Sequence, residues 1–303
     1  MPNVSEGRRA GVIAALAEAA RTVPGARLLD VSSDPDHNRT VLTLAGAPEA
    51  VYEAARRVAA ASVAGIDLTR HEGAHPRIGA IDVVPFVPLL RASIEDCVGL
   101  ARRFASYAAE SLGLPAYLYA AAARRPEFRA LAAIRRGGFE GLRAAIATPE
   151  RRPDLGPARV HPTAGAVAVG ARGVLIAMNA DLAGADATIA RGIARAVRES
   201  SGGLPAVQAI GLWLPRRGVA QVSMNLLDYR RTPPLAAFDR VCEEARRRGA
   251  DVEAGELIGC APREALPPDP VPALRLRDLR EGQVLDAARL AAELDATGEG
   301  GRP

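Results

Sequence analysis

The sequence predicts an α/β (α+β) protein made of two ferredoxin-like βαββαβ halves. Its 303 residues exceed what one core usually supports, and 49% of them are hydrophobic, which is enough for two cores. Between residues 174 and 258 the periodicity changes in the order β-α-β-β-α-β, typical of the ferredoxin-like arrangement. The first half has the same order if residues 2–5 (PNVS) form an opening strand, with a helix and strand added before residue 122.

The helices are predicted from apolar residues that recur with a period of 3.6 and from capping signals, with Ser5 expected to cap the first helix. They lie near residues 7–22, 48–63, 93–113, 128–147, 184–200, 234–248 and 284–294.

The strands are predicted from short runs of apolar and β-branched residues between the helices. These runs are 26–31, 40–46, 80–87, 116–120, 173–180, 206–214, 219–229 and 251–259. The Gly/Ala-rich passage HPTAGAVAVGARG (161–173) is expected to separate the halves, so the predicted domains are 1–174 and 175–303.

The composition excludes several classes of function. All 39 basic residues are arginine, so the lysine that Schiff-base enzymes, pyridoxal-phosphate enzymes and P-loop nucleotidases require is missing. The arginines are scattered without aromatic residues between them, which argues against nucleic acid as a partner and leaves small anions as candidates. No signal peptide or membrane span is recognised, and the three cysteines suit reduced thiols, so we expect a cytoplasmic protein without a membrane partner.

The stretch HEGAH (71–75) matches the zinc-protease pattern H-E-x-x-H, but that pattern binds zinc only on a helix. Gly73 lies between the histidines, and Pro76 forces the residue before it out of the helical region. His71 and His75 should therefore not share a helical face, and we predict no metal site.

Three polar clusters lie in loops beside predicted strands, where functional groups are often found. They are SSDPDHNRT (32–40), RHEGAHPRIGAIDVVPF (70–86) and PDLGPARVHPTAGA (153–166). Turn chemistry alone explains the first cluster equally well, so the spacing does not settle whether these clusters are functional.

Six motifs together resemble the glutamate formimidoyltransferase family, whose domain also forms the transferase part of formimidoyltransferase-cyclodeaminase. The similarity extends in order to about residue 262, and it is to the stand-alone transferase. The motifs are PNVSEGRR (2–9), LLDVSSDPDHNRTVLTLAG (28–46), HPRIGAIDVVPFVP (75–88), PAYLY (115–119), PDLGPARVHPTAGAVAVGAR (153–172) and AQVSMNLLDY (220–229). Val4 replaces a phenylalanine usual in the family, and the Gly-Glu that commonly follows Tyr119 is missing.

The resemblance implies two ferredoxin-like subdomains facing a folate-binding cleft, usually in a homodimer. It implies transfer of the formimidoyl group from N-formimidoyl-L-glutamate to N5 of the co-substrate tetrahydrofolate, in histidine degradation. The catalytic histidine is in the His-Pro-Arg motif, here His75. The implied folate segment is Gly156, Pro157, Ala158, Arg159, Val160, His161, Pro162, Thr163, Ala164 and Gly165.

Physical chemistry suggests roles for the polar residues of these motifs. N5 must lose a proton when it attacks, and neutral His75, with an ordinary pKa near 6.5, is suited to accept it. Asp82 could stabilise the positively charged amidine, or simply pair within the sheet. Asn38, Arg39 and Arg77 are candidates for binding substrate carboxylates, with ion pairs within the protein as the alternative for the arginines.

Two other histidines have expected roles: His71 is expected to support its loop, and His161 to stack or hydrogen-bond within the folate segment. Two other functions remain open. One is formyl transfer from N-formylglutamate to tetrahydrofolate, and the other is folate binding without turnover.

Overall fold

The computed structural model describes residues 1–296, which form two compact units. The first unit comprises Met1–Arg172 and the C-terminal segment that begins at Arg289, and the second comprises Gly173–Ala288. Each unit has its own sheet and its own hydrophobic core, so the prediction of a mixed α/β protein with two subdomains is confirmed.

The first unit contains a six-stranded sheet in the order β2-β3-β1-β4-β6-β5. β1 pairs antiparallel with β3 and β4, whereas β6 pairs parallel with β4 and β5. The strands are β1 (Asn3–Val4), β2 (Ala26–Asp34), β3 (Arg39–Gly46), β4 (Ile81–Phe86), β5 (Ala116–Ala120) and β6 (Val167–Ala171).

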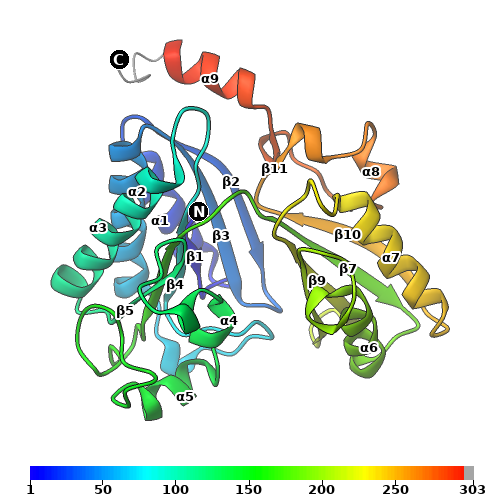
Figure 1. The fold of residues 1–303 in the computed structure, drawn as a ribbon, viewed down its shortest axis with the longest axis horizontal. Helices are drawn as coiled ribbons and strands as arrows, with labels where there is room; N and C mark the ends of the chain where they lie inside the picture. Colours follow the sequence, from blue (N-terminus) through cyan, green and yellow to red (C-terminus); the bar gives the residue numbers. More distant parts are fainter. Residues whose placement is uncertain (297–303) are drawn as a thin grey trace. The chain divides into compact units, whose positions relative to one another are not determined.

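Helices α1 (Ala10–Arg21), α2 (Pro48–Gly65) and α3 (Ile94–Leu112) cover one face of this sheet (Figure 1). α3 begins with a capping box formed by Ser93 and Asp96. The main core of the unit lies between these helices and the sheet. Ser5 does not cap α1, so that prediction is wrong. Its hydroxyl instead donates to the carbonyl of Gly79 (2.7 Å), because β1 lies beside the chain that enters β4.

A smaller core covers the other face of β4, β5 and β6, beneath the segment that follows β5. The sequence predicts one helix over 128–147, and this is wrong. The segment forms a 3₁₀ turn η2 (Pro126–Phe128) and short helices α4 (Leu131–Ile134) and α5 (Gly138–Ala145). Gly137 and Gly138 have φ of +80° and +64°, and this left-handed backbone interrupts the helix.

Strand β6 lies within the passage 161–173 that the sequence suggests as a separator, and the two units divide at the end of that passage, between Arg172 and Gly173. β6 is in fact an interior strand of the first sheet. The small residues allow close packing: a Cβ at Gly170 would lie 2.5 Å from the ring of Tyr119. Gly170 therefore permits close approach within the sheet, and the boundary follows β6.

The second unit has an antiparallel four-stranded sheet in the order β10-β7-β9-β8, with α6 (Ala187–Val197) and α7 (Pro234–Arg246) packed on it. Its strands are β7 (Ile176–Ala183), β8 (Val207–Leu214), β9 (Val219–Leu226) and β10 (Asp251–Ile258). The element order of this second unit is βαββαβ. Four strands of the first sheet, in the order β4-β1-β3-β2, correspond to the order β10-β7-β9-β8 in the second.

Several short elements complete the described chain, and α9 closes it. They are η1 (Leu68–Arg70), η3 (Glu199–Ser201), β11 (Ala261–Pro262), η4 (Arg263–Ala265), α8 (Pro270–Ala273), η5 (Glu281–Gln283), β12 (Val284–Leu285) and α9 (Ala287–Ala296). Within residues 1–296, no helix has the length and apolar character needed to cross a membrane.

Candidate functional site

The loop before β4, residues 66–80, contains His75 and is called the His75 loop below. Three backbone hydrogen bonds join it to the end of the implied folate segment and to Ala166, the residue that follows it, so two motifs far apart in the sequence lie side by side. The bonds are Leu68 N–H to Thr163 O (2.8 Å), Ala80 N–H to Ala164 O (2.9 Å) and Ala166 N–H to Ile78 O (2.9 Å).

Glycines make these close approaches possible. A Cβ at Gly165, where φ is +73°, would lie 2.2 Å from the carbonyl oxygen of Ile78. A Cβ at Gly73 would lie 2.4 Å from the carbonyl oxygen of His37 in the β2–β3 turn. The His75 loop is thus held between the implied folate segment and the β2–β3 turn, and neither glycine can be replaced without moving backbone.

His71 and His75 lie in irregular backbone after η1 ends at Arg70, as Gly73 and Pro76 predict. In the described part of the chain, no group of three or more His, Cys, Asp or Glu residues could hold a metal ion.

Both ring nitrogens of His71 are occupied. Nδ1 accepts a hydrogen bond from Nε of Arg77 (2.8 Å), so Nε2 carries the proton and donates to the carbonyl of Asn38 (2.9 Å). Burial lowers the pKa of His71, which favours this neutral form. His71 therefore supports the loop, as the sequence suggests, and has no nitrogen available to accept a substrate proton.

His75 has the opposite tautomer. Its Nδ1 lies 2.7 Å from the carbonyl oxygen of Pro76, and because a carbonyl only accepts, Nδ1 carries the proton and Nε2 has a free lone pair. The pKa of His75 is well below its ordinary value, first because of burial and then because of the positive charges of Arg39 and Arg135. His75 is therefore neutral near pH 7, the form a general base requires.

His161 stabilises the turn in which it lies. Its Nδ1 accepts the N–H groups of Thr163 (3.3 Å) and Ala164 (3.0 Å), so its proton is on Nε2. Of the three histidines in the two motifs, His75 is the one with Nε2 as the unprotonated nitrogen.

Asp82 on β4 is at the centre of a buried charged cluster. Its Oδ2 accepts from Nη1 of Arg39 (2.8 Å) and from Arg135, and its Oδ1 accepts the N–H of Ile78 (2.8 Å). Burial would raise the pKa of Asp82, but the two arginines and these hydrogen bonds outweigh it and hold the pKa far below its ordinary value. Burial also lowers the pKa of Arg39, to about 10.

Tyr119 at the end of β5 extends this cluster. Burial raises the pKa of its hydroxyl, and the positive charges of Arg172 and Arg135 oppose that rise. Sequence reasoning did not assign roles to Tyr119 or Arg135. Tyr119 is within a quoted motif, but Arg135 is in a stretch read as helix surface, 53 residues from Asp82. Only the two consecutive glycines, Gly137 and Gly138, could have indicated that the predicted helix is interrupted and that Arg135 turns inward.

Asn38 and Arg77, predicted to bind substrate, both have partners within the loops. Asn38 accepts the N–H of Gly7 (2.9 Å) and donates to the carbonyl of Glu72 (2.9 Å), at φ of +47°. Arg77 donates to both carboxylate oxygens of Glu140 (3.0 and 2.8 Å) as well as to His71. Arg39 donates from Nη2 to Asn3 (2.9 Å) in addition to Asp82.

The implied folate segment has two parts. Residues 161–165 form the hydrogen-bonded turn, whereas 156–160 is a loop with Ala158 and Arg159 exposed. Gly156 begins this loop at φ of +83° and lies against the end of α3 and the chain after it. The loop therefore offers exposed side chains on a backbone fixed at both ends.

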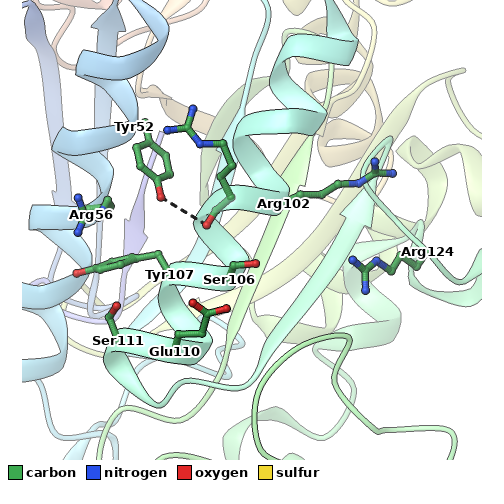
Figure 2. A pocket seen from close by; sticks show the side chains of 9 residues that line it. Tyr52, Arg56, Arg102, Ser106, Tyr107, Glu110, Ser111 and Arg124 are labelled. Atoms are coloured by element: carbon green, nitrogen blue, oxygen red, sulfur yellow. Dashed lines mark hydrogen bonds between the residues drawn. The ribbon is translucent and has the colours of Figure 1, made fainter.

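A shallow depression over α2 and α3 is a different kind of surface (Figure 2). There the guanidinium of Arg56 stacks on Tyr107 (4.3 Å) and that of Arg103 on Tyr52 (4.4 Å). Arg103 also pairs with Glu49. These residues interact with one another, and none of them is a predicted site residue, so we place the candidate site at the His75 loop.

Two protein-family models match the chain. One, described as "Formiminotransferase domain, N-terminal subdomain", matches residues 1–172, and one described as "Formiminotransferase domain" matches residues 177–268. The chain therefore belongs to the formiminotransferase family.

Proteins of similar sequence support this membership. The chain is 42% identical over 266 residues to a glutamate formimidoyltransferase of Streptococcus pyogenes, covering 88% of this chain and 89% of that protein. It is 40% identical over 288 residues to one of Thermoplasma acidophilum, covering 94% and 95%. It is 43% identical over 272 residues to the formimidoyltransferase-cyclodeaminase of Gallus gallus, covering 88% of this chain and 50% of that longer protein.

Proposed function

We propose that the protein is a folate-dependent transferase. It moves the formimidoyl group from N-formimidoyl-L-glutamate to N5 of tetrahydrofolate, giving 5-formimidoyltetrahydrofolate and L-glutamate in histidine degradation. Membership of the family and the names of the relatives support the reaction. The neutral His75, with its proton on Nδ1, is the observation in the structure that carries it.

His75 acts as the base. When N5 attacks the formimidoyl carbon it gains positive charge and becomes acidic, and Nε2 of His75 accepts its proton. The bond from that carbon to the glutamate nitrogen then breaks, and His75 returns the proton to the departing nitrogen. Its hydrogen bond to the Pro76 carbonyl holds the ring in one orientation through both transfers.

Asp82 belongs to the site in a positioning role. Its two oxygens already accept hydrogen bonds from Arg39, Arg135 and the N–H of Ile78. By holding Ile78, Asp82 fixes the strand end of the His75 loop. We therefore propose that it acts through the loop and the arginines and does not contact the amidine.

Tetrahydrofolate is the co-substrate, and we propose that residues 156–165 contact it. The backbone bonds between this segment and the His75 loop support that role, because a ligand held by one would lie near the other. We also propose that the protein works in the cytoplasm, and that it forms a homodimer, as the family resemblance implies.

The direct test is incubation of the purified protein with tetrahydrofolate and N-formimidoyl-L-glutamate, with the product followed by its ultraviolet absorbance. Formation of 5-formimidoyltetrahydrofolate is the expected result. A parallel incubation with N-formyl-L-glutamate tests the alternative donor, which has oxygen in place of NH. Folate binding without product from either donor would replace the proposal with a binding protein.

A further inference from the structure

The Asp82 cluster contains more positive than negative charge. Arg39 and Arg135 both donate to Oδ2 of Asp82, so two cations share one carboxylate. The side chains are 9%, 15% and 0% exposed for Arg39, Arg135 and Asp82, which leaves little solvent to screen the excess. A buried charge without a counterion is costly, and a carboxylate from a ligand would reduce that cost.

Arg135 is the arginine of this site that can receive such a ligand. Within the described residues, the one hydrogen bond of its side chain is the bond from Nη2 to Asp82, and its buried Nε has no acceptor. Arg39 already donates from Nη1 to Asp82 and from Nη2 to Asn3. Arg77 donates from all three of its nitrogens.

Arg135 also lies in the right place. It follows α4, and the chain just after it lies against the His75 loop, since a Cβ at Gly138 would lie 3.5 Å from the carbonyl oxygen of Arg77. The charge of Arg135 is moreover felt at His75, whose pKa is lowered first by burial and then by nearby charges that include Arg135. An anion bound at Arg135 would therefore lie close to the base.

We propose that Arg135 is a specificity-determining residue that binds a carboxylate of the glutamate part of the formimidoyl donor. This inference depends on the proposed function. The donor carboxylate accepts from the guanidinium of Arg135, offsets the excess charge, and places the formimidoyl carbon beside His75. Charge-assisted hydrogen bonds of this kind are the strong ones, so the donor would be chosen by its acid group.

The test compares three donors: N-formimidoyl-L-glutamate, its γ-amide (the glutamine derivative) and its α-amide (the isoglutamine derivative). For the unaltered protein we expect one amide to have a kcat/KM lower by about 10- to 100-fold, the order expected for a lost hydrogen bond to a charged group. Arg135→Met should cause a similar loss with the glutamate donor but little further loss with that amide. Inhibition by L-glutamate should weaken in parallel.

Arg135→Met should still fold, because it leaves Asp82 paired with Arg39 and removes the excess charge. The exposed neighbour Arg136 supplies the matched control, Arg136→Met, which should behave as the unaltered protein. Arg135→Lys, which retains the charge, should recover part of the preference for the acid.

Equal losses for all three donors would show that Arg135 has only a structural role and would overturn the inference. It would equally be overturned if the loss disappeared when tetrahydropteroate, which lacks the glutamate tail, replaced tetrahydrofolate as acceptor. A lack of transfer from every donor by the unaltered protein would instead refute the proposed function.

Discussion

Asp82 in the first unit and Asp181 in the second are both buried carboxylates on sheet strands, and each accepts hydrogen bonds from two arginines. Their surroundings differ. The arginines beside Asp82 are 9% and 15% exposed, whereas Arg217 and Arg277 beside Asp181 are 27% and 41% exposed. The other oxygen of Asp181 accepts from the neutral amide of Gln221 (2.7 Å).

The comparison teaches that one arrangement of ions can have two consequences. Around Asp181, the arginine side chains are more exposed, so solvent screens more of their excess charge and the pairing contributes to the packing of that sheet. Around Asp82, the excess charge is enclosed and is felt by His75. Burial and the neighbouring histidine, more than the ion pairs themselves, make the first cluster a candidate site for chemistry.

The largest expected effect is the loss of the base. His75→Ala should lower kcat by about a hundred- to ten-thousand-fold, with a smaller change in the Michaelis constant for tetrahydrofolate, because the imidazole acts in the transition state. Steady-state kinetics and a separate measurement of folate binding would check this.

His71→Ala is the matched control, and it should lose less activity because both nitrogens of His71 are used inside the loop. Near-normal turnover by His75→Ala, or a failure explained by lost folate affinity alone, would contradict the proton-transfer role and make His161 the next candidate.

The next effect is on stability, and it should differ between the ion pairs around Asp82 and those around Asp181. Asp82→Asn leaves two buried guanidinium groups without an anion and should lower the free energy of unfolding by about 3–5 kcal/mol. Asp181→Asn should cost only about 1–2 kcal/mol, because its arginines are partly solvated. Urea unfolding of both variants measures the difference, and equal losses would show that exposure of the arginines does not matter.

The smallest effect is a shift in pH dependence. The groups facing His75 are Arg39, Arg135, Asp82 and His37. Because the pKa of His75 is lowered, kcat/KM should stay level as the pH falls through 6.5 and decline only below that lowered pKa. Removing a positive charge raises a histidine pKa, so in Arg135→Met the decline should begin at higher pH.

The matched variant Arg136→Met should keep the original profile, since Arg136 is exposed and absent from the cluster. A decline at the same pH in Arg135→Met and the unaltered protein would mean that the charge of Arg135 does not act on His75.

Much of the fold could be predicted from the sequence, because apolar periodicity reflects burial. The runs at 40–46 and 116–120 correspond closely to β3 and β5, and residues 48–63 to α2. β6 could not be recognised, since its alanines and glycine make sense only beside Tyr119. The helix over 128–147 failed because local periodicity carries no information on the backbone required at Gly137 and Gly138.

The sequence by itself determined the family, the mixed α/β fold and His75 as the candidate base. These follow from motifs and from residues near one another in the chain. Pro76 and Gly73, for example, are enough to exclude a helical zinc motif at His71 and His75.

Only the tertiary structure decided which histidine can accept a proton and which arginine has a nitrogen to spare. The tautomer of a histidine depends on what its ring nitrogens meet, and for His71 these are Arg77 and the carbonyl of Asn38, supplied by different loops. Likewise, Arg135 reaches Asp82 only because the chain after β5 folds back over the sheet. Burial then strengthens the effect of that contact, because the same charges would be screened in solvent.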